Sequence, residues 1–272
     1  MTTTLPTYFL SHGGGPWPWL DGPMRAAMAE LERSLQALPA DVGVRPKAIL
    51  MVSGHWEAPA FTVQTHPNPP MVYDYGGFPP HTYRIQYPAP GSPELAARVV
   101  ELLGGSGIEV RTDPERGFDH GVYAPLKPAW PDADVPVVQL SIRRGYDPDE
   151  HLAAGRALAP LRDEGILILG SGLSYHNLAL MGPAGARPSR EFDDWLNETM
   201  LRADPAERVE RLRRWHLAPS ARLAHPSEDH LIPLMVVTGA GGDDPVARTY
   251  HQDDFFGSLA VSNYRFGRTA TA

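Results

Sequence analysis

Three apolar runs, each followed closely by a histidine, most constrain how this chain can fold. The runs are Thr7–Leu10, Ala48–Val52 and Ile166–Leu169, and the histidines that follow them are His12, His55 and His176. Continuous aliphatic runs of this kind, bounded by small polar residues, indicate strands that are buried on both faces. Open α/β sheets bind their ligands beyond the carboxyl ends of such strands. We therefore expect the three histidines near one edge of a buried sheet.

Helical and strand patterns alternate along the rest of the chain, which is typical of an α/β protein. The predicted helices are Met24–Leu38, Ser92–Gly104, Asp149–Arg162, Glu191–Arg202, Glu207–Trp215 and a further one that begins near Ser227. The further predicted strands are Phe61–Gln64, Ile108–Arg111, Val135–Ile142 and Ser258–Phe266. We find no repeat or linker. The pattern predicts that residues 1–272 form a single three-layer α/β domain, with a central mixed, mostly buried sheet, flanking helices and a site at one sheet edge.

Composition excludes several classes of function. The net charge is −8 and no basic cluster occurs, which argues against nucleic acid and anionic membrane surfaces as partners. Without cysteine, the chain has no disulfide, thiolate ligand or cysteine nucleophile. No apolar run approaches the roughly 20 residues that span a bilayer. We expect a cytoplasmic protein.

Histidine is the residue type that can carry chemistry here. Of the eleven histidines, five follow apolar runs or lie in tight loops: His12, His55, His120, His176 and His230. Neutral imidazole suits zinc and iron(II), and three protein ligands leave the open position that a catalytic metal needs. Spacing alone does not decide this, because a lone loop histidine is usually solvated or structural. Outside the five, we expect His151, His216 and His251 to be solvated, His225 to support the site or cap a helix, and His66 and His81 to lie in a long loop.

Seven motifs in a fixed order carry a resemblance to a known family. They are SHGGGP, VSGHWE, YDYGGFP…YPAPGSPELA, GFDHG, VPVVQLSI, GSGLSYHNL and HPSEDHLIPL, and they extend from about residue 7 to residue 240. Together they resemble the class III (LigB-type) extradiol ring-cleavage dioxygenases, and within these the 4,5-DOPA extradiol dioxygenase family. The resemblance implies a mononuclear non-haem iron(II), with zinc recovered in some members. The substrates that it implies are a catechol and O2, and the product is a muconic semialdehyde.

The same resemblance implies roles for the five histidines. It makes His12 and His55 metal ligands, and it places the third ligand in HPSEDH. The histidine-bearing branch of the family implies His230 there, with Glu228 as the alternative. His176 resembles the residue that takes a proton from the catechol and can join the metal as a fourth ligand. His120 resembles a second, proton-donating histidine, although a histidine in a glycine-rich turn can instead bond only to backbone.

Two further interpretations remain open from the sequence. Four aromatic residues of the 66–93 loop either form a wall for the substrate ring or simply pack the loop: Tyr73, Tyr75, Phe78 and Tyr83. The histidines also suit a zinc-dependent hydrolase, and the scaffold suits a non-enzymatic, Memo-like binding protein. A serine hydrolase is not expected, because GSGLS has Gly172 where the nucleophile of GxSxG would stand.

Overall fold

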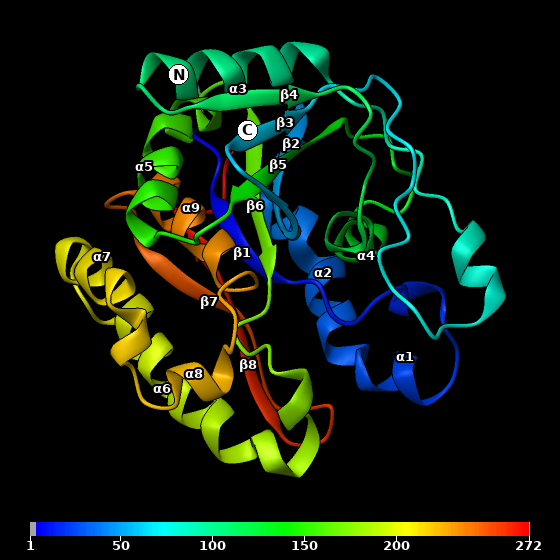
Figure 1. The fold of residues 1–272 in the computed structure, drawn as a ribbon, viewed down its shortest axis with the longest axis vertical. Helices are drawn as coiled ribbons and strands as arrows, with labels where there is room; N and C mark the ends of the chain where they lie inside the picture. The colour runs from blue at the N-terminus through cyan, green and yellow to red at the C-terminus, as the bar shows by residue number, and fades with distance from the viewer. Residues whose placement is uncertain (1–3, 272) are drawn as a thin grey trace.

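The three apolar runs form neighbouring parallel strands in the middle of one mixed sheet (Figure 1). The structure, a computed structural model, describes residues 4–271, and its strands are β1 (Thr7–Ser11), β2 (Ala48–Ala58), β3 (Phe61–Gln64), β4 (Val110–Asp113), β5 (Val137–Arg143), β6 (Ile166–Gly172), β7 (Val246–Phe255) and β8 (Leu259–Phe266). Their order is β4-β3-β5-β2-β6-β1-β8-β7. Ala48 lies opposite Ile166, and Thr7 lies opposite Ile168. The carboxyl ends of β2, β6 and β1 therefore meet at one edge.

Antiparallel pairs flank this parallel centre on both sides. β3 runs antiparallel to β5, while β8 runs antiparallel to β1 and β7 to β8. The predicted mixed sheet is thus confirmed. β7 has no counterpart among the predicted strands, because this outermost strand carries Arg248, Asp253 and Asp254 in place of an apolar run. A strand with one unpaired edge can keep charged side chains in water.

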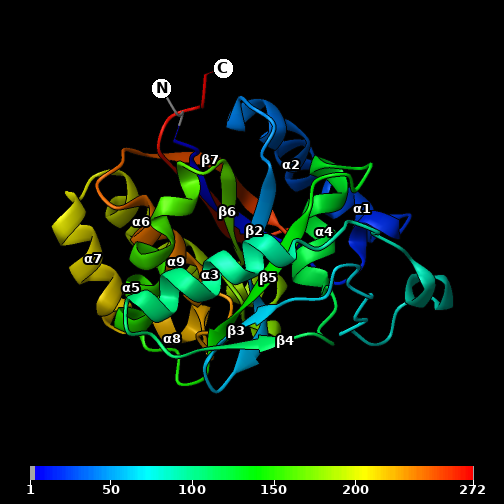
Figure 2. The same cartoon turned by 90° about the horizontal axis from the view of Figure 1, so that it is seen from above.

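Helices cover both faces of the central strands, as Figure 2 shows from above. They are α1 (Pro23–Ala27), α2 (Ala29–Val42), α3 (Pro93–Gly105), α4 (His120–Ala129), α5 (Pro148–Leu158), α6 (Ala186–Leu201), α7 (Pro205–Arg213), α8 (Ala221–Ala224) and α9 (Ile232–Gly241). The contacts of two successive residues of β6 show which helix covers which face of the sheet. A Cβ on Gly170 would lie 2.6 Å from the Pro233 carbonyl oxygen of α9, whereas the Ser171 hydroxyl donates to the Gly121 carbonyl of α4. Because neighbouring residues of a strand face opposite sides, α9 and α4 lie on opposite faces.

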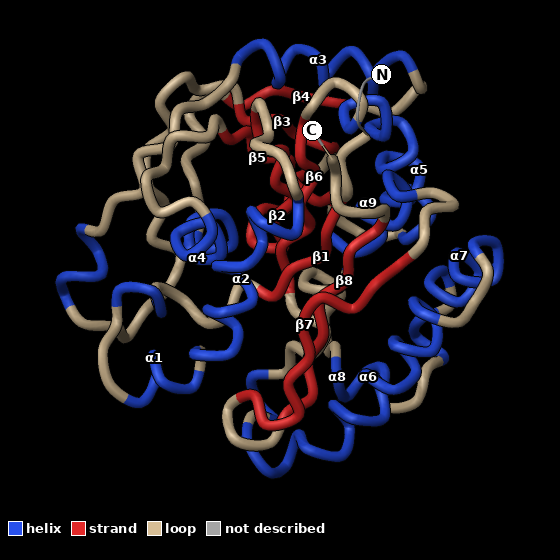
Figure 3. Tube along the Cα trace, turned by 180° about the vertical axis from the view of Figure 1, so that it is seen from behind, coloured by secondary structure: helices blue, strands red, loops and turns tan. Residues whose placement is uncertain are grey.

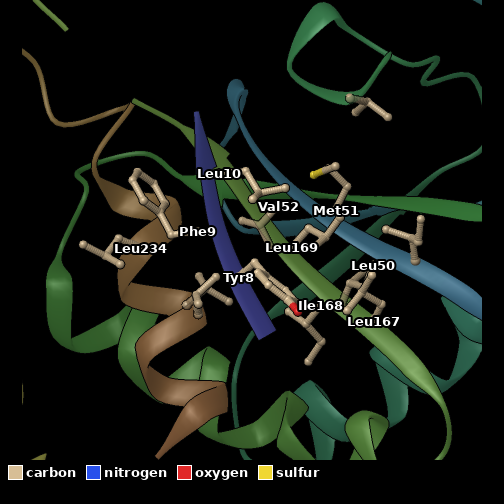
Figure 4. Close-up of a cluster of buried hydrophobic side chains, with 14 of the residues drawn as sticks. Tyr8, Phe9, Leu10, Leu50, Met51, Val52, Leu167, Ile168, Leu169 and Leu234 are labelled. Atoms are coloured by element: carbon tan, nitrogen blue, oxygen red, sulfur yellow. The ribbon is translucent and has the colours of Figure 1, made fainter. Parts of the chain in front are cut away.

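The core fills the space between these layers. Residues 49–52 of β2 and 167–169 of β6 have no exposed surface. Figure 4 shows their side chains beside those of β1, with Leu234 of α9 near Phe9. Burial on both faces explains why these strands read as unbroken apolar runs. In Figure 3, α6 lies alongside β8 and extends the helical cover to the outer strands.

The strand β2 is longer than the apolar run predicts. It continues beyond Val52 to Ala58, and its pairing with β5 shifts between Ser53 and Glu57. His55 therefore lies within the irregular part of the strand instead of after its end. Such a bulge changes the direction of a side chain relative to a regular strand.

The boundaries of two predicted helices differ from those in the structure. The predicted helix Met24–Leu38 is divided into α1 and α2 at Met28, whose backbone is not helical. α9 begins at Ile232, after Leu231, so Ser227 does not cap it. Within residues 4–271, no helix combines the length and the apolar character that a membrane span requires.

The segment around His120 is the helix α4, where the sequence predicts a loop. Two prolines inside it, Pro125 and Pro128, together with the preceding glycine-rich turn, account for the wrong prediction. Proline removes a backbone donor from a helix and is rare in its interior. α4 is nevertheless almost entirely buried between the sheet and α2, so tertiary packing outweighs local preference.

Candidate metal centre

Five histidines from separate parts of the chain meet at the carboxyl edge of the central strands. His12 follows β1 directly, His55 lies in the irregular part of β2, and His176 follows β6. His120 is the first residue of α4, and His230 lies just before α9. All five line one cavity of about 880 Å³. The predicted histidine cluster at a sheet edge is thus confirmed.

Two glycines allow the HPSEDH segment to lie directly against the strand ends. A Cβ on Gly54 would lie 2.7 Å from the Asp229 carbonyl oxygen, and a Cβ on Gly172 would lie 2.0 Å from that of His230. The amide of Leu173 also donates to the His230 carbonyl. Any side chain at either glycine would push this backbone away. The glycines of SGHWE and GSGLS therefore fix the position of His230 relative to the sheet.

The ring nitrogens of three histidines face one another. The Nε2 atom of His55 lies 3.3 Å from Nε2 of His12 and 3.1 Å from Nε2 of His230. Candidate ligand atoms of His12, His55 and His120 all lie within 4.8 Å of one another. Those of His176, Asp229 and His230 meet the same limit. The cluster thus brings enough donors together for a mononuclear metal.

Two carboxylates bind the opposite side of these rings. Asp229 accepts a hydrogen bond from Nδ1 of His230 at 2.5 Å. Asp74 contacts Nδ1 of His120 at 2.9 Å and Nδ1 of His55 at 3.3 Å. A carboxylate at Nδ1 keeps the proton there and leaves the Nε2 lone pair free, as in many metal-binding histidines. Lone pairs of two neutral rings repel when they face each other, and a cation between them removes that repulsion. The donor set therefore fits a divalent metal.

Burial favours the neutral form of four of the five histidines by lowering their pKa values. Desolvation lowers the pKa of His12 and His230 well below the usual value, and it lowers the pKa of His55 to about 4. It also lowers the pKa of His176, against the opposing effect of the Asp229 charge. Neutral imidazole is the form that ligates metals. Burial alone would raise the pKa of Asp74, but its hydrogen bonds and charge interactions with His120 lower it.

His176 and His230 lie face to face. Their ring centroids are 3.4 Å apart and their planes differ by 13°. The backbone amide of His176 donates to the Ala224 carbonyl, which ties the end of the β6 loop to α8. His225, which follows Ala224 at the end of α8, is fully buried, and its Nε2 atom lies 2.9 Å from the Ser174 carbonyl oxygen. It packs behind the cluster and does not line the cavity.

Other residues singled out in the sequence lie apart from the cluster. Glu228 forms an ion pair with Arg222 at 2.8 Å and is not part of the cavity lining. Of the four loop aromatics, Tyr75 and Phe78 line the cavity. Tyr73 and Tyr83 instead pack around Tyr75, with ring centroids 6.3 Å and 5.4 Å from it. Two of the four aromatic residues therefore form part of the cavity wall, and the other two pack the loop.

Of the three histidines expected in solvent, one is fully buried and one is partly buried. His151 is fully buried; it contacts the Asp147 carbonyl at 2.7 Å through Nδ1, and its Nε2 accepts from the Arg143 amide. The charged neighbours of His151 in the sequence lie on the outer side of α5. A pattern based on these neighbours therefore predicts an exposed histidine. His251 is partly buried and bonds to Ser262 at 3.0 Å. His216 is exposed as predicted.

Asp74 is the functional candidate that sequence reasoning missed. It lies in the long 66–93 loop, far in sequence from both histidines that it contacts. Besides the two rings, it accepts a hydrogen bond from the His120 backbone amide at 3.0 Å. Its only signal in the sequence was its place in YDYGGFP, one of the motifs that carry the family resemblance.

Comparison with known proteins gives consistent matches over almost the full length. The family model described as the catalytic LigB subunit of aromatic ring-opening dioxygenase matches residues 6–267. A 4,5-DOPA dioxygenase extradiol of Beta vulgaris is 40% identical over 267 residues, covering 97% of each chain. One of the same name from Escherichia coli K12 is 37% identical, covering 98% of this chain and 96% of its own. The crystal structure of an uncharacterized protein from E. coli K12 superposes with a TM-score of 0.78 at 34% identity, covering 97% of this chain and 100% of that one.

Proposed function

This chain belongs to the LigB family of aromatic ring-opening dioxygenases, and we propose that its histidine cluster is the metal centre of that reaction. The protein is an extradiol ring-cleaving dioxygenase. As substrates we propose O2 and a catechol-type, DOPA-like aromatic, opened to a muconic semialdehyde. As the place of action we propose the cytoplasm.

The proposed ligands are His12, His55 and His230. The observation that carries this assignment is the approach of their Nε2 atoms, 3.3 Å and 3.1 Å apart, with carboxylates at Nδ1 of two of the rings. Iron(II) is the metal that we expect in the active enzyme, and zinc is a second metal that neutral imidazoles retain. When bound, such a metal would bring the catechol and O2 together and would stabilise the negative charge that develops in the reaction.

The remaining two histidines suit proton transfer. His176 borders the cavity beside the proposed ligands, so its ring nitrogen can take a proton from a catechol hydroxyl, and it is also the proposed fourth ligand before substrate binds. His120 is held through Nδ1 by Asp74, which leaves its Nε2 atom free to exchange a proton with the substrate. General acid–base catalysis of this kind contributes about 10²–10⁴-fold.

Metal content and oxygen uptake test the assignment together. The wild-type protein, loaded anaerobically with iron(II), should bind one equivalent and consume O2 when a catechol is added. His12→Ala, His55→Ala and His230→Ala should each lose that equivalent while their circular dichroism spectra stay native. Glu228→Ala is the matched control, because its carboxylate pairs with Arg222 away from the cavity.

Two results would contradict the proposal. Full metal occupancy in a histidine variant would remove that residue from the ligand set, and metal loss in Glu228→Ala would put a carboxylate in place of His230. Hydrolysis without O2 uptake would instead point to the zinc hydrolase.

A further inference from the structure

The cavity beside the histidines has negative side chains and no positive one. Its acidic lining residues are Glu57, Asp74 and Asp229, and within residues 4–271 no lysine or arginine lines it. Asp74 and Asp229 bind histidine Nδ1 atoms, as described above. Glu57 is exposed and forms no ion pair with a lysine or arginine of the described chain. Apart from the proposed metal, an anionic group on the substrate would therefore find no cationic lysine or arginine among the described lining residues.

Much of the remaining wall is apolar. It includes Met24, Phe78, Leu178, Met181, Phe256 and Leu259, which come from the first turn of α1, the 66–93 loop, the β6–α6 connection, the β7–β8 turn and the start of β8. Leu178 is 73% exposed, and of the four large exposed apolar side chains in residues 4–271 it alone lines the cavity. Leu178 thus continues the apolar wall to the cavity rim, and an apolar group bound along this wall would remove the contiguous apolar surface from water.

From these two observations, and resting on the proposed ring cleavage, we infer that the natural substrate shares the catechol ring of DOPA but carries an uncharged, apolar substituent, such as an alkyl or aryl group, in place of the charged side chain of DOPA. The catechol oxygens point to the histidine cluster, so the substituent extends along the apolar wall towards Leu178. A substituent that ends in a carboxylate would lie against this apolar wall, and within residues 4–271 no lysine or arginine lines the cavity to pair with it. Like charges across an interface of this kind are strongly disfavoured.

Three catechols of nearly equal shape test the inference. Their ring substituents end in a methyl group (4-propylcatechol), an ammonium group (dopamine) and a carboxylate (3-(3,4-dihydroxyphenyl)propanoate), and DOPA serves as a fourth compound. For the iron-loaded protein, we expect kcat/KM for 4-propylcatechol to exceed that for the propanoate by about tenfold or more. Anaerobic titration calorimetry should give the same order in Kd, without requiring turnover.

A charge introduced at Leu178 should change this preference. Leu178→Arg places a cation on the cavity rim, so it should lower the ratio of kcat/KM for 4-propylcatechol over the propanoate by about tenfold. Leu217→Arg is the matched control. Leu217 is 70% exposed, also lies in a short 3₁₀ turn and does not line the cavity. It should leave the ratio unchanged.

The outcomes separate this inference from the proposed function. Equal or better use of the propanoate or DOPA by the wild-type protein would overturn the inference and leave the dioxygenase intact. Preference for dopamine over 4-propylcatechol would overturn it in favour of an ammonium site. An equal shift in both arginine variants would also overturn it. If none of the four compounds is bound or cleaved, the proposed function itself fails.

Discussion

At the carboxyl edge of the sheet, His55 and His230 turn nitrogen towards nitrogen, whereas at the start of α5 His151 turns both of its nitrogens towards backbone groups. Burial lowers the pKa of His151 to about 4, just as it does for His55. The two regions therefore share burial and neutral charge. They differ in whether the protein supplies a hydrogen-bond partner for both ring nitrogens.

This difference separates a structural histidine from a candidate ligand. His151 donates from Nδ1 to the Asp147 carbonyl and accepts the Arg143 amide at Nε2, so it has no capacity left for a metal or a substrate. In the cluster, Nδ1 of His55 and His230 meets a carboxylate and Nε2 meets only another imidazole. A perturbed pKa identifies burial, and only the hydrogen-bond partners identify a site.

The largest effect should come from a histidine that acts on protons. His176→Phe should keep its metal and still bind catechol, because the other three proposed ligands remain when this fourth one is removed, yet ring cleavage should fall by on the order of 10²–10⁴-fold. Metal content, the catecholate absorption band and product formation should be measured on one preparation. Near-normal turnover would remove His176 from the chemistry, and loss of metal in step with activity would make it a ligand that the metal requires throughout.

A second prediction concerns Asp74, the carboxylate that contacts two histidine rings of the cluster, whereas the ring of His151 is held by backbone groups. Asp74→Asn keeps the shape but removes the negative charge that holds Nδ1 of His55 and His120. We expect metal affinity to fall by about 10–100-fold, the usual cost of losing such a partner. Competition with a metal chelator measures the affinity. Asp253→Asn is the control, because Asp253 contacts His251 and does not line the cavity. An equal change in that variant would show that the effect is general electrostatics.

His151 should have the smallest effect, and only on stability. Its pKa is lower in the folded protein, about 4, than in the unfolded chain, about 6.5. The unfolded chain thus takes up the proton first as pH falls, so this contribution to stability is complete above pH 6.5 and is lost towards pH 4. Between pH 7.5 and 5, the wild type should lose about 2 kcal/mol more than His151→Gln in urea unfolding. His216→Gln, at an exposed position, should behave as the wild type does.

The centre of the fold was predictable from the sequence, and the periphery was not. β1, β2 and β6 are buried on both faces, so their apolar runs are unbroken and easily recognised. β7 lies at the edge and keeps Asp253 and Asp254 in solvent, which hides it among polar segments. α4 was obscured by Pro125 and Pro128, because its burial compensates for a poor local preference.

The site divides in the same way. The five histidines were predicted because each follows an apolar run or lies in a tight loop, and each lies in a motif that carries the family resemblance. Asp74 was missed, since its contacts with His55 and His120 depend on the path of a long loop that has no periodic pattern. The burial of His151 was missed for a related reason: the surrounding sequence, DPDEH, is charged, and only the packing of α5 against the sheet decides which side of the helix is buried.

The contact between His55 and His230 joins residues that are 175 positions apart in the chain. During synthesis, a chain that has emerged only as far as β6 carries His12 and His55 on their strands but lacks the third imidazole. Closing so long a loop has an entropic cost that native packing must offset before the two rings can meet. A metal that requires all three rings would bind only the finished fold, and its binding energy would be added wholly to the native state. A bound metal would then indicate that the C-terminal third of a newly synthesised chain, which contains His230, has folded against the sheet.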